Sequence, residues 1–553
     1  MDDLVTLSAR ARAWAAEDPD PVTRAEALRL ADGATSNDAA ILAALHEGFD
    51  GWLEFGTAGL RGTLGPGPGR MNRLLVRKAT AGLASYVARM IPEARTRGVV
   101  IGHDARNGSE AFTDEATAVL VAAGFRVHRC PPLSPTPLVA FLTRHLDAAA
   151  GIVVTASHNP PAYNGYKVYW ANGAQIIPPH DRGIAAAIRA QEPAIAEGGA
   201  VVWLDADVVH TAYLAAIAGQ LAHLPKGSTP VRVAYTPLHG VGAHLCEAAL
   251  THDGAAVLTV PEQRAPDGAF PTVTFPNPEE IGAMDRVEAL AGEHGLDVAL
   301  ANDPDADRLA VSVRRDDGRF RRLSGDELGA LLGEALLAQR PATARPAYVA
   351  KTIVSSDLLA RIAESHGATC QETLTGFKWL WNRALELDAT HDFVFAYEEA
   401  LGYAVGPAVR DKDGIGAALL VARLLSHGIP LWTRLEALWR RHGYVASRQK
   451  SLVDAAPGGI ARHAARMAAL RASPPLAIGG RAVARVRDWL PGTDCLTLTL
   501  DDGARVILRP SGTEPKLKAY LQTVLPYAGA QTVADADVAL DALQTAVFTE
   551  LLG

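Results

Sequence analysis

The sequence predicts an α/β protein of several domains that ends in a smaller α+β domain. Three regions repeat one alternation, in which a short apolar run of β type leads into a polar or glycine-rich turn and then into a helical pattern. This alternation is the signature of parallel α/β units. The chain of 553 residues is also too long for one hydrophobic core, because single cores stop growing at about 250–300 residues.

Six candidate strands each lead directly into a polar turn. They cover residues 98–101 before HDARNGS, 151–155 before ASHNP, 231–235 before TPLHGVG, 298–301 before NDPDADR, 348–351 before TIVSSD and 393–396 before YEEALGY. Ligands of open α/β sheets bind outside the carboxyl ends of the strands. We therefore expect the functional residues in these turns and not in the helices.

The C-terminal part of the chain has a different pattern. Candidate strands at 449–453, 495–500, 504–508 and 517–521 surround turns such as Asp501-Asp502-Gly503, and a helical pattern follows residue 534. Segments 205–223 and 430–442 are expected to be helices that link domains. We place the domains at 1–204, with an N-terminal helical extension, and at 205–319, 320–440 and 441–553.

Composition narrows the class of protein. The chain is 48% hydrophobic and 21% charged, which is typical of a globular protein, and its net charge of -8 argues against a nucleic-acid surface. Its four cysteines are far apart, so neither a disulfide framework nor a thiolate zinc cluster is indicated. No signal peptide and no run of about 18 apolar residues is present. We expect a cytoplasmic monomer or homodimer that binds neither nucleic acid nor membrane.

Three carboxylates alternate in Asp303-Pro304-Asp305-Ala306-Asp307, directly after the candidate strand 298–301. Residues two apart in an extended or looped segment can point the same way. Converging carboxylate oxygens are what a hard divalent cation such as Mg²⁺ prefers. Taken alone, the motif fits an exposed acidic turn equally well.

A second turn places a hydroxyl beside an imidazole, in Thr155-Ala156-Ser157-His158-Asn159. Ser157 could be a nucleophile or a carrier of phosphate. No G-x-S-x-G pattern surrounds it, so an esterase is not indicated. By itself the segment also fits an ordinary turn whose Ser and Asn side chains bond their own backbone.

Two further turns combine glycine with arginine. One is Gly56-Thr57-Ala58-Gly59-Leu60-Arg61-Gly62, and the other is Arg509-Pro510-Ser511-Gly512-Thr513-Glu514-Pro515-Lys516. The guanidinium fork, the hydroxyls, the ammonium and the backbone donors near a glycine all suit a phosphate group. A solvated hairpin explains a basic turn of this length equally well, and no Walker A loop is present.

Taken together and in order, these segments closely resemble the α-D-phosphohexomutase superfamily, in particular the longer phosphoglucomutase/phosphomannomutase chains of the phosphopentomutase-like branch. The motifs are FGTAGLRG, GHDARNGS, TASHNPPAYNGYKVYW, TPLHGVG, FPNPEE, NDPDADR, TGFKW, FAYEEALGY, RDKDG and RPSGTEPK. They span nearly the whole chain. The resemblance implies three similar α/β domains with mixed, mostly parallel sheets and a C-terminal α+β domain, arranged around a central active-site cleft.

The resemblance also implies roles for individual residues. Ser157 would carry a phosphoryl group and hold Mg²⁺ with Asp303, Asp305 and Asp307. The implied catalytic residues are Ser157, His158, Lys167, Arg61 and Lys412. The implied substrate-binding residues are Thr57, Arg61, Asp307, Arg308, Thr375, Gly376, Lys378, Glu398, Ala400 and Lys412, and the implied phosphate-binding residues are Arg509, Ser511, Gly512, Thr513 and Lys516.

A family member of this kind would pass the phosphoryl group of Ser157 to a sugar phosphate and take back the other phosphate of the bisphosphate formed. We expect interconversion of glucose 1-phosphate and glucose 6-phosphate, with mannose phosphates as further substrates and glucose 1,6-bisphosphate as activator or intermediate. Ala400 stands where many hexose mutases have serine, which removes one hydroxyl from the sugar loop. The alternatives are a phosphopentomutase, a glucose 1,6-bisphosphate synthase and a non-catalytic binding protein.

Overall fold

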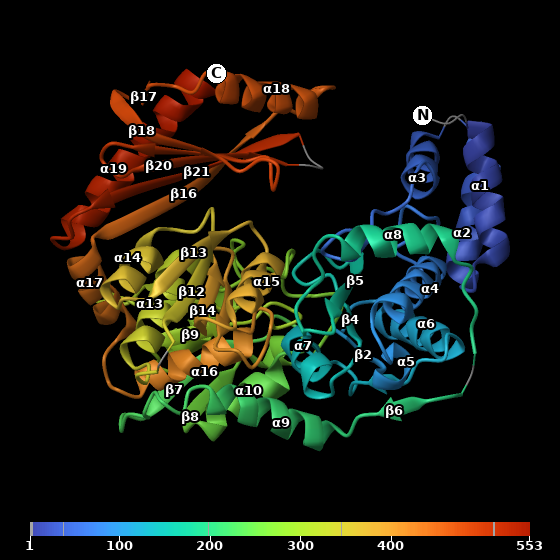
Figure 1. Cartoon of the computed structure of the whole chain (residues 1–553), viewed down its shortest axis with the longest axis horizontal. Helices are drawn as coiled ribbons and strands as arrows, with labels where there is room; N and C mark the ends of the chain where they lie inside the picture. The colour runs from blue at the N-terminus through green and yellow to red at the C-terminus, as the bar shows by residue number, and fades with distance from the viewer. Residues whose placement is uncertain (1–3, 37, 197, 344, 512–514, 553) are drawn as a thin grey trace. The chain divides into compact units, whose positions relative to one another are not determined.

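The computed structural model describes residues 4–36, 38–196, 198–343, 345–511 and 515–552. The chain forms two compact units. Unit 1 comprises Met1–Leu323, Phe377–Ala389 and Ala400–Gly428, and unit 2 comprises Ser324–Gly376, Thr390–Glu399 and Ile429–Gly553. Figure 1 labels most of the helices and strands of both units along the chain.

The first helices of unit 1 pack against one another ahead of the first sheet. They are α1 (Leu4–Glu17), α2 (Pro21–Asp32), the short η1 (Gly33–Thr35) and α3 (Ala39–Phe49). Asp20 and Asp38 cap α2 and α3, because their side chains accept hydrogen bonds from the first backbone N–H groups. Leu7 and Trp14 of α1 and Phe49 of α3 join the core that continues into the first sheet.

The first sheet has the order β1-β5-β4-β2-β3-β6. Its strands are β1 (Leu60–Thr63), β2 (Val99–His103), β3 (Val127–Arg129), β4 (Ala150–Val154), β5 (Tyr163–Trp170) and β6 (Val201–Trp203), and its helices are α4 (Arg73–Met90), α5 (Ala94–Arg97), α6 (Ser109–Ala122), α7 (Thr136–His145) and α8 (His180–Ala190). The β2–β3 and β3–β4 crossovers run in opposite directions. Right-handed crossovers therefore place α6 and α7 on opposite faces of the sheet (Figure 1).

The second sheet of unit 1 carries the acidic motif. Its order is β11-β10-β9-β7-β8, in which β7, β8 and β9 are parallel. The elements are α9 (Ala206–Gly219), β7 (Val231–Thr236), α10 (Ala243–His252), β8 (Ala255–Thr259), α11 (Pro261–Arg264), α12 (Asp285–Glu293), β9 (Val298–Ala301), β10 (Ala310–Arg314) and β11 (Phe320–Arg322). Because β7 and β9 are neighbours, the turns after them lie side by side. The N–H group of Val241 donates to the carbonyl of Pro304 at 2.8 Å.

Unit 2 begins with a parallel arrangement in which β12 lies between β13 and β14. Its elements are α13 (Gly325–Ala338), β12 (Ala347–Thr352), α14 (Leu358–Ser365), β13 (Thr369–Thr373), β14 (Asp392–Glu398) and α17 (Leu431–His442). Ser324 and Glu327 form a capping box at the start of α13. Between these elements the chain contributes α15 (Phe377–Leu387), β15 (Gly402–Val405) and α16 (Gly414–Leu425) to unit 1.

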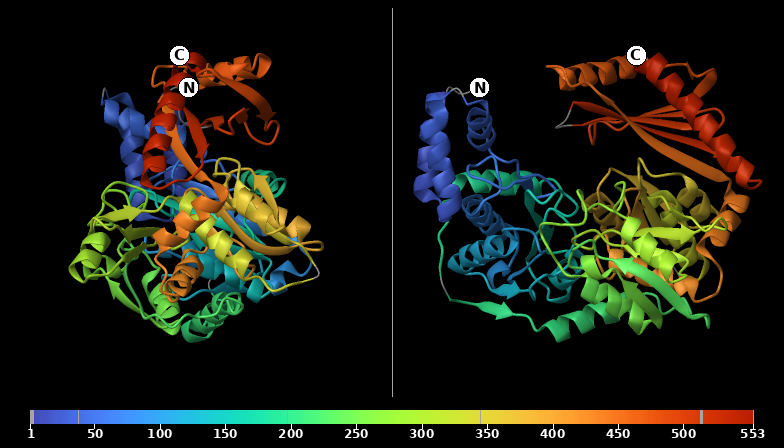
Figure 2. Two further views of the ribbon diagram at one scale, coloured as in Figure 1. Left: turned by 90° about the vertical axis from the view of Figure 1, so that its left-hand side faces the viewer. Right: turned by 180° about the vertical axis from the view of Figure 1, so that it is seen from behind.

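The C-terminal part of unit 2 is an antiparallel sheet of order β16-β21-β20-β19-β18-β17. Its elements are β16 (Tyr444–Val453), α18 (Gly459–Ala472), β17 (Ala477–Ile478), β18 (Arg481–Asp488), β19 (Leu496–Leu500), β20 (Arg505–Pro510), β21 (Lys516–Leu525), α19 (Ala530–Ala546) and the π-helical η2 (Val547–Leu551). α18 and α19 cover one face of this sheet (Figure 2). Ile507 and Tyr520 pack against Ile353 and Val354.

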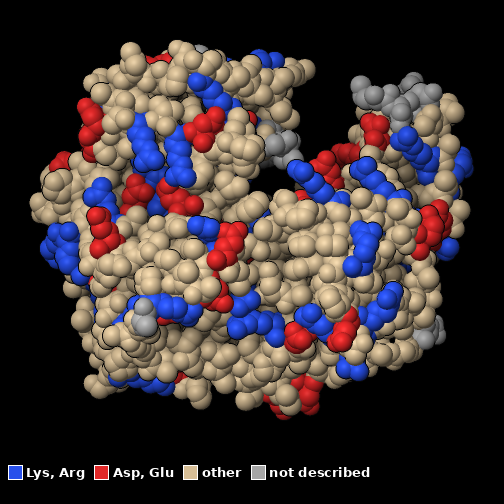
Figure 3. Space-filling model, viewed as in Figure 1, with Lys and Arg blue, Asp and Glu red and all other residues tan. Residues whose placement is uncertain are grey.

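The predicted fold class is confirmed. Each of the six expected strands is present, as β2, β4, β7, β9, β12 and β14, and the C-terminal domain is α+β. The boundaries expected near residues 204, 319 and 440 and the central cleft stay predictions. Among the described helices, none combines the length and apolarity that a membrane span needs. Acidic and basic side chains are interspersed on the face shown in Figure 3.

Candidate active site

Ser157 lies in the turn that follows β4, in unit 1. Its backbone is left-handed, with φ of 52°, and its N–H group donates to the Thr155 hydroxyl at 2.8 Å. The Ser157 hydroxyl donates to Oδ2 of Asp303 at 2.8 Å and lies 3.1 Å from Nδ1 of His158. The side chain is nearly buried, at 3% exposure. The hydroxyl of Ser157, at the end of a strand of the first sheet, thus contacts the acidic motif 303–307 of the second sheet.

The three aspartates of the acidic motif converge. Asp303, Asp305 and Asp307 are fully buried after β9, and each offers a carboxylate oxygen within 4.8 Å of the others. Ala306 between them has a left-handed backbone, with φ of 57°, which bends the segment. Among the described residues, Oδ1 of Asp305 and Oδ1 of Asp307 have no hydrogen-bond partner. Buried oxygens left free in this way fit a hard divalent cation.

Two ammonium groups compensate the negative charge of this site. Nζ of Lys167, on β5, lies 2.7 Å from Oδ2 of Asp305 and 3.0 Å from Oδ2 of Asp307. Nζ of Lys412 lies 2.9 Å from the same oxygen of Asp307. Burial disfavours the charged form of Lys167, but the two carboxylates outweigh it and raise the pKa of Lys167. Both lysines are therefore charged partners of the acidic motif.

The balance between burial and neighbouring charges also shifts the pKa values of the three aspartates. Burial raises the pKa of the Asp303 carboxyl, and the carboxylates of Asp305 and Asp307 raise it further. For Asp307, burial acts in the same direction but the attraction of Lys167 and Lys412 overcomes it, so its pKa lies below the ordinary value. The pKa of Asp305 is lowered as well, because Lys167 outweighs burial and Asp307.

His158, Arg308 and Arg61 complete this group of residues in unit 1. Burial, with the positive charges of Arg308 and Arg61, lowers the pKa of His158, so the imidazole is neutral at neutral pH. The backbone N–H of Arg308 donates to Oδ1 of Asp303 at 3.1 Å. The exposed Arg61 side chain donates to Oδ1 of Asn159 at 3.2 Å. The structure therefore brings together the residues predicted around Ser157.

Two predicted substrate-binding residues meet on the same unit. The ammonium group of Lys378, on α15, donates to the hydroxyl of Thr57. Thr57 belongs to the glycine-rich turn 56–59, where Gly59 has φ of 75° and a Cβ would lie 1.8 Å from the carbonyl oxygen of Tyr166. Only glycine fits this close approach. The turn is thus fixed against the strand that also carries Lys167.

The remaining predicted residues of the sugar loop, apart from Ala400, belong to unit 2. The N–H group of Gly376 donates to Oε1 of Glu398 at 2.7 Å, and the buried hydroxyl of Thr375 makes no hydrogen bond with the described residues. Ala400 opens the next segment of unit 1 and precedes Leu401, whose φ is 61°. A sugar-binding role for these residues stays a prediction.

The predicted phosphate turn joins β20 to β21 in unit 2. Arg509 ends β20, Lys516 begins β21, and the N–H group of Ser511 donates to the carbonyl of Lys516 at 2.8 Å. Gly512 and Thr513 lie outside the described residues. The described residues on either side of 512–514 thus belong to two paired strands, and contact of this segment with phosphate stays a prediction.

Thr136 is a site residue that the sequence did not indicate. It opens α7, and its hydroxyl donates to Oδ2 of Asp305 at 2.6 Å while its N–H group donates to the carbonyl of Asp305 at 3.0 Å. A signal existed in Pro131-Pro132-Leu133-Ser134-Pro135, a rigid turn after a parallel strand. The role of this turn follows from its contact with Asp305, which belongs to the second sheet and is distant in the sequence.

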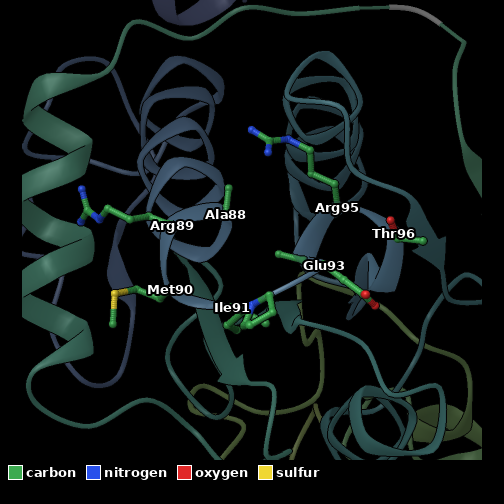
Figure 4. A pocket seen from close by; sticks show the side chains of 9 residues that line it. Ala88, Arg89, Met90, Ile91, Glu93, Arg95 and Thr96 are labelled. Carbon is green, nitrogen blue, oxygen red and sulfur yellow. The ribbon is translucent and has the colours of Figure 1, made fainter.

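A surface pocket of about 310 Å³ lies elsewhere in unit 1, lined by residues 88–96. Figure 4 shows Arg89 extending from the end of α4 and Arg95 from α5. None of the predicted catalytic, substrate-binding or phosphate-binding residues lines it. The candidate active site is therefore the Ser157–Asp303 constellation and not this pocket.

Four family profiles match the chain. They are described as phosphoglucomutase/phosphomannomutase, alpha/beta/alpha domain I at residues 53–194, domain II at 211–318 and domain III at 324–442, and the C-terminal domain at 466–539. The chain belongs to the phosphoglucomutase/phosphomannomutase family of the α-D-phosphohexomutase superfamily, in its longer-chain, phosphopentomutase-like branch. It is an enzyme of the intramolecular phosphotransferase type, an isomerase.

Three curated relatives illustrate the similarity. A Schizosaccharomyces pombe protein named "Probable phosphoribomutase" is 38% identical over 515 residues, covering 85% of this chain and 86% of that protein. A Homo sapiens protein named "Phosphopentomutase" is 36% identical over 529 residues, covering 87% and 86%. A Haemophilus influenzae protein named "Probable phosphomannomutase" is 39% identical over 471 residues, covering 82% and 92%.

Proposed function

We propose that this chain is a phosphopentomutase, which interconverts the 1-phosphate and 5-phosphate of ribose or deoxyribose. The observation that carries the proposal is the similarity to relatives named for pentose phosphates, over more than four fifths of the chain. These relatives fit our alternative better than the glucose mutase that we first expected. Ala400 supports the same substrate, because a pentose phosphate has fewer hydroxyls to bind than a hexose phosphate.

Ser157 is the proposed relay of the phosphoryl group. In the first transfer, the bond from phosphorus to Oγ of Ser157 breaks as the 5-hydroxyl of ribose 1-phosphate bonds to phosphorus and loses its proton. The bisphosphate then turns around, and its 1-phosphoryl group passes to Oγ while the anomeric oxygen gains a proton. The left-handed backbone of Ser157 supports a fixed position of Oγ in both transfers, and the free hydroxyl, before it takes up the 1-phosphoryl group, donates to Asp303 at 2.8 Å.

Asp303, Asp305 and Asp307 are the proposed ligands of Mg²⁺, with the side chain of Ser157. The buried Oδ1 atoms of Asp305 and Asp307, which have no hydrogen-bond partner among the described residues, and the all-oxygen chemistry of the three carboxylates support this choice of metal. A bound Mg²⁺ would neutralise charge on the transferring phosphoryl group. Phosphoryl transfer depends mainly on alignment and charge neutralisation, so no further nucleophile is needed.

The cationic side chains of unit 1 have proposed roles beside Ser157. Lys167 and Lys412 hold the carboxylates of the acidic motif in place and add positive charge next to the reacting oxygen. The neutral imidazole of His158, 3.1 Å from Oγ of Ser157, can accept or donate a hydrogen bond and so orient this oxygen. Arg308 and Arg61 are proposed to contact the phosphoryl group, and Arg509, Ser511 and Lys516 the phosphate that is not reacting.

The test is the ratio of kcat/KM for ribose 1-phosphate to that for glucose 1-phosphate, each assayed with its own sugar bisphosphate as activator. We expect this ratio to be about 10 or more, because the two sugars differ in the hydroxyl groups with which the site can form hydrogen bonds. A preference for glucose 1-phosphate or mannose 1-phosphate would contradict the pentose assignment and leave the class of reaction intact.

A hexose mutase is the second candidate, because the relative named for mannose phosphate is 39% identical. The same assay separates the two. A glucose 1,6-bisphosphate synthase would form product only when an external phosphoryl donor, such as 1,3-bisphosphoglycerate, is supplied. Turnover of a sugar 1-phosphate with a catalytic amount of its bisphosphate and no other donor would exclude the synthase as the main activity.

A further inference from the structure

Arg106 contacts the turn that carries Ser157 through its side chain. It belongs to the turn after β2, and Ser157 to the turn after β4, which is the parallel neighbour of β2. The carboxyl ends of adjacent parallel strands open onto the same edge of a sheet. Arg106 is buried, at 3% exposure, and no role in binding or catalysis follows from its position in the sequence.

The guanidinium group of Arg106 donates to four backbone carbonyls in residues 157–163, which run from Ser157 to the first residue of β5 and are called the serine turn here. Its NH1 atom donates to the carbonyls of Pro160 at 3.0 Å and Tyr163 at 3.2 Å. Its NH2 atom donates to the carbonyl of Asn159 at 2.6 Å and to the carbonyl of Ser157 itself. All four N–H bonds of the two terminal nitrogens are therefore used on one turn. Lysine, with three donors on a single nitrogen, cannot span the same set.

Asp104 links the guanidinium group of Arg106 to the N–H group of Ser157. Its Oδ1 accepts from the N–H group of Arg106 at 3.0 Å and from the Ser109 hydroxyl at 2.7 Å. Its Oδ2 accepts from the Thr155 hydroxyl at 2.6 Å and lies 3.3 Å from Nε of Arg106. The same Thr155 hydroxyl accepts the N–H group of Ser157 at 2.8 Å. The carbonyl of Ser157 thus accepts directly from Arg106, and its N–H group is linked to Asp104 through the Thr155 hydroxyl.

This arrangement offsets two costs of the serine turn. A left-handed backbone at a residue other than glycine costs about 1–3 kcal/mol, and Ser157 adopts it. Inward-facing carbonyls without a donor would add the cost of unpaired buried groups. The guanidinium carbon of Arg106 also lies over the ring of Phe270, 5.0 Å from its centre, and this contact confines the guanidinium group further.

We propose that Arg106, with Asp104, is a positioning residue that fixes the direction of the Ser157 hydroxyl through the backbone of its turn. The inference rests on the proposed relay role of Ser157. None of the described hydrogen bonds joins Arg106 to Asp303, Asp305 or Asp307. The carboxylates of Asp303 and Asp305 attract its charge, but its described side-chain hydrogen bonds go to the serine turn, so its main contribution is to geometry.

The test compares Arg106→Lys with Arg129→Lys. Arg129 is a matched control, because it is equally buried in the same sheet and donates to Thr117 and Asp114 at 2.8 Å, away from the serine turn. Three quantities are measured: hydrogen exchange of the amides in 157–163, the rate of phosphorylation of Ser157 by glucose 1,6-bisphosphate, and the Kd of a sugar monophosphate. Thr155→Val, with Thr155→Ser as its conservative partner, removes the link to the Ser157 N–H if Arg106→Lys fails to fold.

We expect Arg106→Lys to speed exchange in 157–163 and to slow phosphorylation and kcat by about 100-fold, the usual cost of a misplaced reacting atom. The Kd should change by no more than about 3-fold, since no substrate contact is lost. Arg129→Lys should lower Tm without these effects, and Thr155→Ser should behave as wild type where Thr155→Val does not. Unchanged exchange and phosphorylation in Arg106→Lys would overturn the inference. Absence of phosphorylation in the wild type would instead contradict the proposed relay. The hydrogen exchange of residues 157–163 alone would then test whether Arg106 holds the serine turn.

Discussion

The hydroxyl of Ser157 donates to Oδ2 of Asp303 at 2.8 Å, although 146 residues separate the two along the chain. The contact joins the carboxyl ends of β4 and β9, which belong to two different sheets of unit 1. Each sheet alone supplies half of the proposed phosphoryl-transfer site. The packing of the two sheets therefore creates the site, and the first predictions concern its members.

Ser157→Ala should abolish mutase turnover and leave sugar-phosphate binding intact, because the variant loses the atom that carries the phosphoryl group and no charged group that binds substrate. The measurement is kcat by a coupled assay together with Kd by calorimetry. Ser312→Ala is the control, since Ser312 is also buried and hydrogen-bonded, to Glu288 at 2.5 Å. Turnover near the wild-type rate in Ser157→Ala would refute the relay.

Chelation should stop turnover, and Mg²⁺ should restore it and raise Tm. A ligand at 100 times its Kd stabilises the folded state by about 2.7 kcal/mol. Asp305→Asn should lose most of this stabilisation, because it removes a buried carboxylate whose Oδ1 is free. Thermal scans with and without Mg²⁺ provide the measurement. An equal shift of Tm in Asp305→Asn and wild type would show that the cation binds elsewhere.

Thr136→Val should weaken the response to Mg²⁺ by about 10–100-fold, the usual effect of losing a group that orients a metal ligand. The Thr136 hydroxyl donates to Oδ2 of Asp305 at 2.6 Å, and valine keeps the shape but not the donor. Thr136→Ser keeps the hydroxyl and should stay within about 3-fold of wild type. The concentration of Mg²⁺ at half-maximal activity is the measurement, and equal values for both variants would contradict the role of the hydroxyl.

Asp413 should make unit 1 less stable as the pH rises from about 4 to about 6. Burial raises the pKa of its carboxyl from 3.8 to about 6, although it accepts hydrogen bonds from the N–H groups of Ile415 and Gly416 and from the Tyr213 hydroxyl. The folded state therefore binds the proton more tightly than the unfolded state, so this stabilisation is complete below 3.8 and is lost as the pH passes 6.

The variant that isolates this effect is Asp413→Asn, which cannot ionise. Its Tm should rise relative to that of the wild type as the pH increases from 4.5 to 7.5, a range that spans the raised pKa. Scanning both proteins in the same buffers cancels the titration of all other groups. A difference in Tm that does not vary with pH would show that Asp413 is ionised throughout this range.

The sequence predicted those parts of the fold in which local pattern and burial agree. Strand 298–301 has the expected bounds, since a buried parallel strand is a continuous apolar run that a polar turn ends. β5 was not indicated, because Lys167 interrupts its apolar pattern, and the carboxylates that pair with Lys167 belong to Asp305 and Asp307, about 140 residues away. Tertiary structure supplies that compensation.

The same limit applies to the site. Ser157 and the three aspartates stand out because their residue types and order match a family pattern. Thr136 and Arg106 do not stand out, since their partners are an aspartate 169 residues away and backbone carbonyls more than 50 residues away. Backbone carbonyls carry no residue type, so a sequence cannot indicate which side chain will bind them.

The most direct test is to locate the phosphoryl group on the protein. The wild type is incubated with ribose 1,5-bisphosphate or glucose 1,6-bisphosphate and Mg²⁺, digested, and sequenced by tandem mass spectrometry, before and after a chase with excess ribose 1-phosphate. We expect one phosphoryl group, on Ser157, which the chase removes as pentose bisphosphate appears. Continued turnover with the phosphoryl group on another residue, or with no phosphorylated protein at any time, would contradict it.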